Sequence, residues 1–144
     1  MNRPISVAIL IAFLPASVMA GVYDGGGRIA DYLDPNAARS RDRLEIAGVC
    51  ASACTIKLGA RNACVHADAR LLFHAARDTD GRFDRLATLM MLQEYPRQIR
   101  DWAKSHGALD SQAFTAMSGS VAIALGVPDC DALRRRSSHL APAY

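Results

Sequence analysis

Hydrophobic residues in the first half of the chain come in short runs that are separated by polar or glycine-containing segments. Short apolar runs with such boundaries are typical of strands buried in a sheet. The pattern predicts strands over residues 44–50, 63–65 and 70–75. Small side chains follow the first of these runs, and residues 53–58 are then expected to form a short helix.

Hydrophobic residues within residues 29–38 and through the second half of the chain recur at the spacing of one helix face. The predicted helices cover residues 29–38 near the start of the chain and then residues 83–94, 97–105, 111–117 and 118–125. Pro96 interrupts the helical pattern because proline lacks the amide N–H that a helix interior needs. Ser118 is expected to cap the last of these helices, and residues 127–130 are expected to be extended.

The large apolar side chains of this half are expected to lie in the core rather than against a cofactor. They are Met90, Met91, Trp102 and Phe114; on the helix of residues 83–94, Phe83, Leu86 and Met90 share one stripe with Leu89 or Met91. Nothing in the sequence indicates an organic cofactor.

The N-terminus has the pattern of a secretory signal peptide. Residues 5–20 carry no charge, Arg3 precedes them, and Val18-Met19-Ala20 is a small-residue cleavage signal. We therefore predict a signal peptide over residues 1–20, cleavage after Ala20, and a periplasmic or secreted domain over residues 21–144. An N-terminal membrane anchor is the alternative, but the apolar run is short for a span of about 20 residues.

Charge excludes one class of partner. The whole chain has 144 residues and a formal net charge of +3, and its clearest basic cluster is Arg134-Arg135-Arg136 near the C-terminus. A basic run this short is usually a solvated tail, so no nucleic-acid partner is expected.

Four cysteines follow the signal segment: Cys50, Cys54, Cys64 and Cys130. An even number in an exported chain predicts two disulfides, with three pairings. We favour Cys64 with Cys130 and Cys50 with Cys54, but Cys54 with Cys64 also fits the spacing. A zinc site is the competing interpretation; since no Cys-x-x-Cys pair is present, no metal is expected.

The candidate chemistry centres on Ser52 and His74. Ser52 lies between two alanines where the first predicted strand gives way to a helix, and catalytic serines often occupy such a turn at the positive end of a helix. A serine hydroxyl needs a base to accept its proton, and His74 follows an apolar strand that could bring it to the same sheet end. Capping by the serine and simple hydrogen bonding by the histidine are the non-catalytic interpretations.

An oxyanion intermediate needs N–H donors beside the nucleophile. The amide of Ala53, directly after Ser52, is one candidate, and the amide of Gly26 within Gly25-Gly26-Gly27 is the other. Three consecutive glycines let the backbone approach a ligand closely. The same glycines also fit a flexible linker after the signal peptide.

In this order of motifs the chain resembles the ClpP/crotonase superfamily, and in particular small exported ClpP-like proteins. The matching segments are the Gly26-Gly27 loop, the Ser52 turn, the stretch Cys64-Val65-His66-Ala67, His74, and the closing segment from Met117-Ser118 to Asp129. The resemblance implies an α/β domain with a truncated ClpP/crotonase-like βαβ spiral, in which a short sheet is flanked by helices. It also implies a serine peptidase with Ser52 as nucleophile and His74 as general base.

The chain departs from the family pattern at two places. Phe114 stands at about the position of the family's third catalytic residue, an aspartate, and Asp110 is out of register. The strand and helix that precede the glycine loop in the family are missing, which leaves an exposed sheet edge that invites pairing with another subunit or a peptide. The sequence therefore supports two hypotheses: a serine hydrolase with a Ser–His dyad, and a non-catalytic module that binds a peptide or protein partner.

Residues outside the motif receive structural roles. The other three histidines, His66, His106 and His139, are expected at the surface, and Asp129 is expected in a structural turn.

Overall fold

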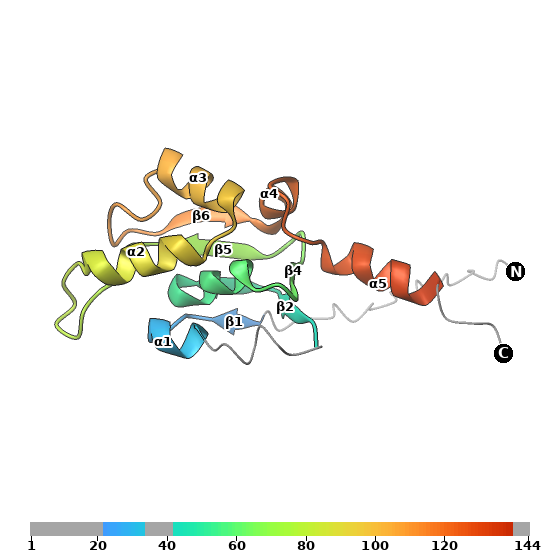
Figure 1. Cartoon of the computed structure of the whole chain (residues 1–144), viewed down its shortest axis with the longest axis horizontal. Helices are drawn as coiled ribbons and strands as arrows, with labels where there is room; N and C mark the ends of the chain where they lie inside the picture. The colour runs from blue at the N-terminus through green and yellow to red at the C-terminus, as the bar shows by residue number, and fades with distance from the viewer. Residues whose placement is uncertain (1–21, 34–41, 140–144) are drawn as a thin grey trace, which may run out of the picture.

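The computed structural model describes residues 22–33 and 42–139, which form a mixed α/β fold with small sheets and flanking helices (Figure 1). A four-stranded sheet has the order β1-β3-β5-β6, and a two-stranded sheet pairs β2 with β4. The strands are β1 (Tyr23–Asp24), β2 (Leu44–Ile46), β3 (Val49–Ala51), β4 (Ala63–Val65), β5 (Arg70–Phe73) and β6 (Thr115–Ser118). The helices are α1 (Ile29–Tyr32), the 3-10 helix η2 (Ser52–Gly59), α2 (Arg85–Glu94), α3 (Arg97–Ser105), α4 (Gly119–Ala124) and α5 (Cys130–His139).

Three strands of the larger sheet, β1, β3 and β5, run parallel. Their register places the residues that follow β3 and those that follow β5 at the same end of the sheet. β3 pairs with β5 so that Ala51 lies opposite Leu72, while β6 is antiparallel to β5 and puts Thr115 opposite Phe73. The residues that follow β3 and β5 and the residue that precedes β6 therefore meet at the same end of the sheet. That end carries the candidate site.

The single strand predicted over residues 44–50 is wrong, because Gly48 divides it into two strands of different sheets. Gly48 has a φ of +61°, which glycine adopts at little cost. A methyl group added at Gly48 would lie 2.1 Å from the carbonyl oxygen of Val22. The close approach to the start of β1 requires glycine there, and it turns the apolar run out of one sheet into the other.

The helix predicted over residues 111–117 is also wrong, because its second half is strand β6. Along β6, Thr115 is half-buried, Ala116 exposed, Met117 buried and Ser118 exposed. This alternation is that of a strand with one face on the core. Ser118 nevertheless caps the following helix α4 as expected, since its Oγ accepts a hydrogen bond from the Val121 amide.

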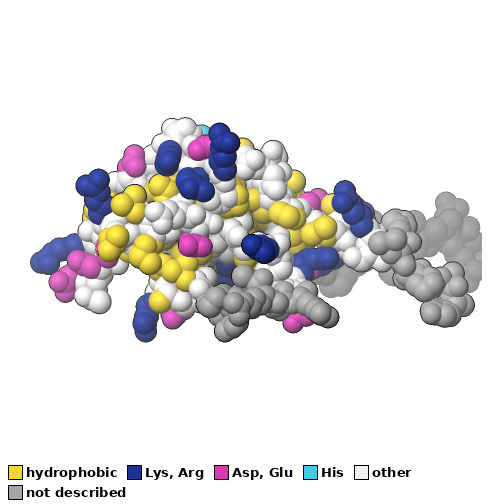
Figure 2. Space-filling model, in the orientation of Figure 1, with side chains coloured by type: hydrophobic (Ala, Val, Ile, Leu, Met, Phe, Trp, Pro, Cys, Tyr) yellow, Lys and Arg dark blue, Asp and Glu magenta, His cyan; other side chains and the backbone are white. Residues whose placement is uncertain are grey.

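Helix α2 buries a different face from the predicted one. Its buried residues are Thr88 and Met91, whereas Phe83, Leu86, Leu89 and Met90 are exposed, as is Phe114. Thr88 turns inward because its Oγ1 accepts the Ala76 N–H at 2.9 Å and donates to the Asp84 carbonyl at 2.6 Å. Hydrophobic side chains consequently gather on the surface over α2 (Figure 2). The predicted burial of Met91 is confirmed. Trp102 packs against Phe73, with 5.4 Å between their ring centroids.

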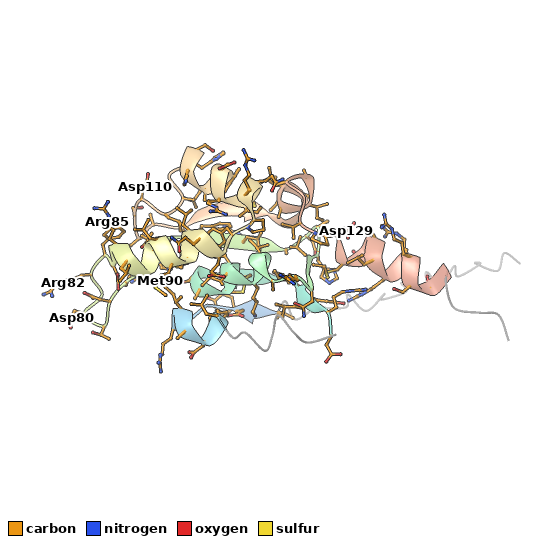
Figure 3. All side chains as sticks on the ribbon, in the orientation of Figure 1. Asp80, Arg82, Arg85, Met90, Asp110 and Asp129 are labelled. Atoms are coloured by element: carbon orange, nitrogen blue, oxygen red, sulfur yellow. A yellow bond between two sulfur atoms is a disulfide. The ribbon has the colours of Figure 1, made fainter. Side chains whose placement is uncertain are left out.

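A polar loop precedes α2 and projects from the body of the protein, with Asp80 and Arg82 at its outer end (Figure 3). The Asp78 carboxylate closes this turn by accepting the amides of Asp80 and Arg82. At the other end of α2, Pro96 separates α2 from α3, as the sequence predicts. The helix expected over residues 53–58 forms as η2, and the part of the helix expected over 29–38 that follows Leu33 lies outside the described residues.

Both disulfides that we favoured from the sequence are present: Cys50–Cys54 and Cys64–Cys130. All four cysteines are buried, and because their sulfur atoms are bonded to one another, they do not form a zinc site. Cys64–Cys130 joins β4 to the start of α5. Two disulfides are compatible with export to an oxidising compartment. The predicted signal peptide, residues 1–20, lies outside the described residues; within residues 22–33 and 42–139, no helix is long and apolar enough to cross a membrane.

Candidate active site

Ser52 has an unusual backbone conformation at the junction of β3 and η2. Its φ is +57°, and within residues 22–33 and 42–139 it is the one residue other than glycine with a positive φ. Residues with a Cβ rarely adopt a positive φ, and residues held in this left-handed region cluster at functional sites. The structure thus places Ser52 in a sharp strand-to-helix turn of the type that presents catalytic serines.

A buried hydrogen-bond relay fixes the backbone of this turn. Thr55 Oγ1 donates to the Ser52 carbonyl oxygen at 2.7 Å, and it lies 2.7 Å from the hydroxyl oxygen of Tyr95. Burial raises the pKa of Tyr95 well above its usual range, although the hydrogen bond with Thr55 acts in the opposite direction. The Tyr95 hydroxyl therefore stays protonated and available to the relay.

His74 follows β5 directly and lies at the same end of the sheet as Ser52. The parallel register of β3 and β5 produces this arrangement, since Ser52 comes directly after Ala51 and His74 comes two residues after Leu72, the partner of Ala51. Among the described residues no hydrogen bond joins Ser52 to His74. The structure brings the segments that contain Ser52 and His74 to the same end of the larger sheet.

The surroundings of His74 keep its imidazole neutral near pH 7. The residue is only 5% exposed. Burial lowers the pKa of His74 from its ordinary value of 6.5, the Arg77 charge lowers it further, and a backbone interaction at Ala75 opposes both effects. A neutral imidazole is the form that can accept a proton from a serine hydroxyl.

Phe114 packs against the ring of His74. The two rings meet edge to face, with 4.9 Å between their centroids and an interplanar angle of 85°. The Nδ1 atom of His74 is buried and has no hydrogen-bond partner among the described residues. The side chain packed against the His74 ring is therefore aromatic, and no acceptor among the described residues orients His74 through Nδ1.

The glycine loop packs directly on the Ser52 turn. Gly26 has a φ of +77°, and a methyl group added to it would lie 2.6 Å from the Ala51 carbonyl oxygen, 2.8 Å from Ser52 Cβ and 2.9 Å from the Ala53 amide nitrogen. The Gly26 amide itself donates to Asp24 Oδ1 at 3.0 Å. The predicted meeting of the glycine loop with the serine turn is present, but the Gly26 N–H is engaged within its own loop.

Asp24 is a site residue that the sequence analysis missed. Besides the Gly26 amide, its carboxylate accepts hydrogen bonds from the Tyr32 hydroxyl at 2.6 Å and from Lys57 Nζ at 2.6 Å. Burial would raise the pKa of Asp24, but these hydrogen bonds outweigh it and lower the pKa. Burial and the bond to Asp24 raise the pKa of Tyr32 to about 12. The cluster ties the glycine loop to α1 and η2.

A cavity of about 640 Å³ opens beside this cluster. Its walls come from the glycine loop, α1, η2 and the end of α2, and they combine apolar with charged side chains. Its lining includes Gly26, Gly27, Tyr32, Ile56, Lys57 and Glu94. Neither Ser52 nor His74 is among its lining residues.

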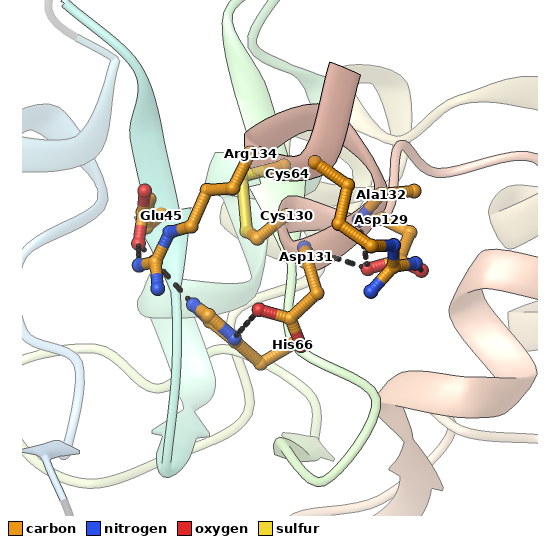
Figure 4. A network of polar contacts seen from close by, with 9 residues as sticks. Glu45, Cys64, His66, Asp129, Cys130, Asp131, Ala132 and Arg134 are labelled. Atoms are coloured by element: carbon orange, nitrogen blue, oxygen red, sulfur yellow. Dashed lines mark hydrogen bonds and ion pairs between the residues drawn. A yellow bond between two sulfur atoms is a disulfide. The ribbon is translucent and has the colours of Figure 1, made fainter. Parts of the chain in front are cut away.

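A second polar network links Glu45, His66, Asp131 and Arg134 (Figure 4). His66 lies between the carboxylates of Glu45, 3.2 Å from Nε2, and Asp131, 3.5 Å from Nδ1. Arg134 also pairs with Glu45. These contacts join β2 and the end of β4 to α5. Two expectations are corrected here: residues 134–136 belong to helix α5 rather than to a tail, although their side chains are exposed as expected, and the His66 side chain is only 16% exposed.

The same region contains a group that resembles metal ligands. Glu45, His66 and Cys130 are close enough to hold an ion, but the Cys130 sulfur is bonded to Cys64. Instead of binding an ion, Glu45 and His66 pair with Arg134 and Asp131, and these contacts hold helix α5 to the smaller sheet. His106 is exposed, as expected, and stacks on Trp102.

The fold and site define a small mixed α/β protein with two buried disulfides and a strained serine turn at one end of the larger sheet. The chain matches no protein-family model, no curated protein and no solved structure.

Proposed function

We propose that this protein is a periplasmic serine hydrolase of ClpP-like type, most readily a peptidase, in which Ser52 is the nucleophile and His74 the general base. The observation that carries the proposal is the left-handed backbone of Ser52 at the end of a strand whose parallel neighbour leads into His74. Strain at a serine in a strand-to-helix turn is characteristic of nucleophiles. The neutral imidazole of His74 supports a role as the base, and the packing of the glycine loop on the Ser52 turn supports a role in binding the oxyanion.

In this mechanism His74 takes the proton of the Ser52 hydroxyl as Oγ attacks the substrate carbonyl carbon. The resulting oxyanion lies near the Ala53 amide at the start of η2; because the Gly26 N–H donates to Asp24, another amide of the Gly25–Gly27 loop would have to be the second donor. His74 then gives the proton to the leaving group, which departs and leaves an acyl group on Ser52. Water hydrolyses that ester with His74 again acting as base, and the free serine is restored.

Covalent labelling tests the proposal. A fluorophosphonate reacts with an activated serine by losing fluoride and forming a phosphonyl ester, so the purified protein is expected to be labelled once, at Ser52. The Ser52→Ala variant should lose the label. Ser118→Ala is the matched control, because Ser118 also lies at a strand-to-helix junction, and it should be labelled like the wild type. Absence of labelling in the wild type, or its persistence in Ser52→Ala, would overturn the proposal.

The pH profile of labelling should carry the signature of a buried base. Burial and the Arg77 charge lower the pKa of His74. Its imidazole therefore stays neutral at pH values somewhat below 6.5, the ordinary pKa of histidine. The labelling rate should therefore fall as the pH drops through this lowered pKa, with a midpoint below pH 6.5. The Arg77→Gln variant should move the midpoint upward, since it removes one of the lowering charges. A midpoint above pH 6.5 in the wild type would contradict this assignment.

The alternative function is a non-catalytic ClpP-like module that binds a peptide or protein partner, or a second copy of itself, along an open sheet edge. The contact between Phe114 and His74 favours it, because His74 Nδ1 has no orienting acceptor there. In serine proteases the loss of that carboxylate costs about four orders of magnitude in turnover. Weak reactivity of Ser52 is thus expected even if the proposal is correct.

Restoring a carboxylate separates the two functions. The Phe114→Asp variant should raise the labelling rate of Ser52 at least tenfold, because an aspartate beside His74 can accept a hydrogen bond from Nδ1–H and stabilise the imidazolium that forms. Phe114→Asn is the control of equal size without the charge, and its gain should be smaller. No gain with Asp would favour the binding module.

A further inference from the structure

We propose that the Cys50–Cys54 disulfide is a positioning element for Ser52, and that the protein's two disulfides have separate tasks. The inference rests on the proposed hydrolase function. Ser52 is the central residue of the segment that this disulfide closes, since Cys50 and Cys54 are four positions apart with Ser52 midway between them. Cys50 belongs to β3 and Cys54 to η2, so the bond crosses the strand-to-helix turn.

The disulfide forces the chain to reverse within a very short segment. Its two Cα atoms are 5.4 Å apart, whereas four residues of extended chain would span roughly 13 Å. Cys50 and Ala51 are held in the extended conformation by their pairing with Leu71 and Leu72 of β5. The bend therefore falls on the next residue, Ser52, which has the left-handed φ of +57°.

The Thr55–Tyr95 relay holds the same turn from its other side. Thr55 Oγ1 binds the Ser52 carbonyl oxygen, and Tyr95 binds Thr55. Cys50 and Cys54 are at most 2% exposed, so the bond is enclosed in the core beneath the turn. The disulfide thus limits the positions of Cys50 and Cys54 while the relay limits the peptide group of Ser52.

The other disulfide offers a natural comparison. Cys64–Cys130 closes a separation of 66 residues and docks α5 on β4, and neither of its cysteines belongs to β3 or η2. Closing a longer loop removes more conformational freedom from the unfolded chain and is expected to stabilise the fold more. The two bonds should therefore rank in opposite order for overall stability and for the reactivity of Ser52.

The experiment compares two double variants, Cys50→Ala/Cys54→Ala and Cys64→Ala/Cys130→Ala. The rate of fluorophosphonate labelling is measured well below the melting temperature of each protein, and Tm is measured separately. Loss of Cys50–Cys54 should slow labelling at least tenfold and lower Tm by the smaller amount. Loss of Cys64–Cys130 should lower Tm more and leave the labelling rate within about twofold. Equal labelling rates in wild type and Cys50→Ala/Cys54→Ala would overturn the inference.

A second measurement separates this inference from the proposed function. The ¹³Cα and ¹³Cβ chemical shifts of Ser52 report its left-handed backbone in every variant, whether or not the serine reacts. If the wild type is never labelled, the hydrolase proposal fails, and the positioning role stands only if Cys50→Ala/Cys54→Ala loses this signature while Cys64→Ala/Cys130→Ala keeps it. If the double-alanine protein does not fold, Cys50→Val/Cys54→Ala refills part of the buried volume and takes its place, with the same outcomes.

Discussion

Replacing Gly26 with alanine is expected to abolish labelling of Ser52, with a loss of at least a hundredfold in rate. The added methyl group would lie 2.6 Å from the Ala51 carbonyl oxygen and 2.8 Å from Ser52 Cβ, and neither of these backbone-bound neighbours can move without shifting the serine turn. The left-handed φ of +77° adds strain, which for a residue with a Cβ costs about 1–3 kcal/mol. The rate of fluorophosphonate labelling and the urea midpoint are the measurements.

Gly81→Ala is the matched control for this substitution. Gly81 has nearly the same backbone angle, with a φ of +80°, but a methyl group added there would meet nothing within 4 Å. Its backbone strain should lower stability by a similar amount without changing the labelling rate. If Gly26→Ala retains wild-type labelling, the glycine loop does not adjoin the reacting atoms, and the oxyanion assignment is wrong.

Removing the Cys64–Cys130 disulfide should produce the largest loss of stability of any change considered for this protein. The chain-entropy relation gives about 4 kcal/mol for a separation of 66 residues and about 2 kcal/mol for a separation of four. Small domains have about 5–15 kcal/mol in total. Urea unfolding of the Cys64→Ala/Cys130→Ala protein should therefore show a midpoint far below that of the wild type.

The Cys50→Ala/Cys54→Ala protein is the control for this measurement, because all four cysteines are buried and each pair leaves a similar cavity. Its midpoint should lie between those of the wild type and of the other double variant. The reverse order would mean that packing around the serine turn, rather than loop closure, dominates the contribution of the disulfides.

The exposed apolar side chains show where local pattern and tertiary structure diverge. Phe83, Leu86 and Met90 share a stripe at helical spacing, which predicts a buried face. Thr88 instead takes the buried side of α2, because its hydroxyl satisfies the Ala76 amide at the end of the segment that contains His74. A single polar group that pairs with a buried N–H outweighs the average hydrophobicity of the opposite face.

The apolar run before Ser52 shows a second limit of prediction from the sequence. A run from Leu44 to Cys50 has the composition of one strand, and its length gives no sign of a break. The division at Gly48 depends on the approach of Val22, which is distant in sequence. Likewise, the Asp24–Lys57 ion pair joins residues 33 positions apart, and only the presence of Asp24 directly before three glycines could have drawn attention to it.

Local features of this protein follow from the sequence by itself: an extended segment directly before Ser52, the helix after it, the stop at Pro96 and the Ser118 cap. These depend on neighbouring residues, whose backbone preferences and hydrogen bonds act over a few positions. The tertiary structure alone decided which side of α2 is buried, how β3 and β5 bring the Ser52 and His74 segments to one edge, and that Phe114 stands against the imidazole. Those outcomes depend on contacts between distant segments, and their energies are settled only when the whole core packs.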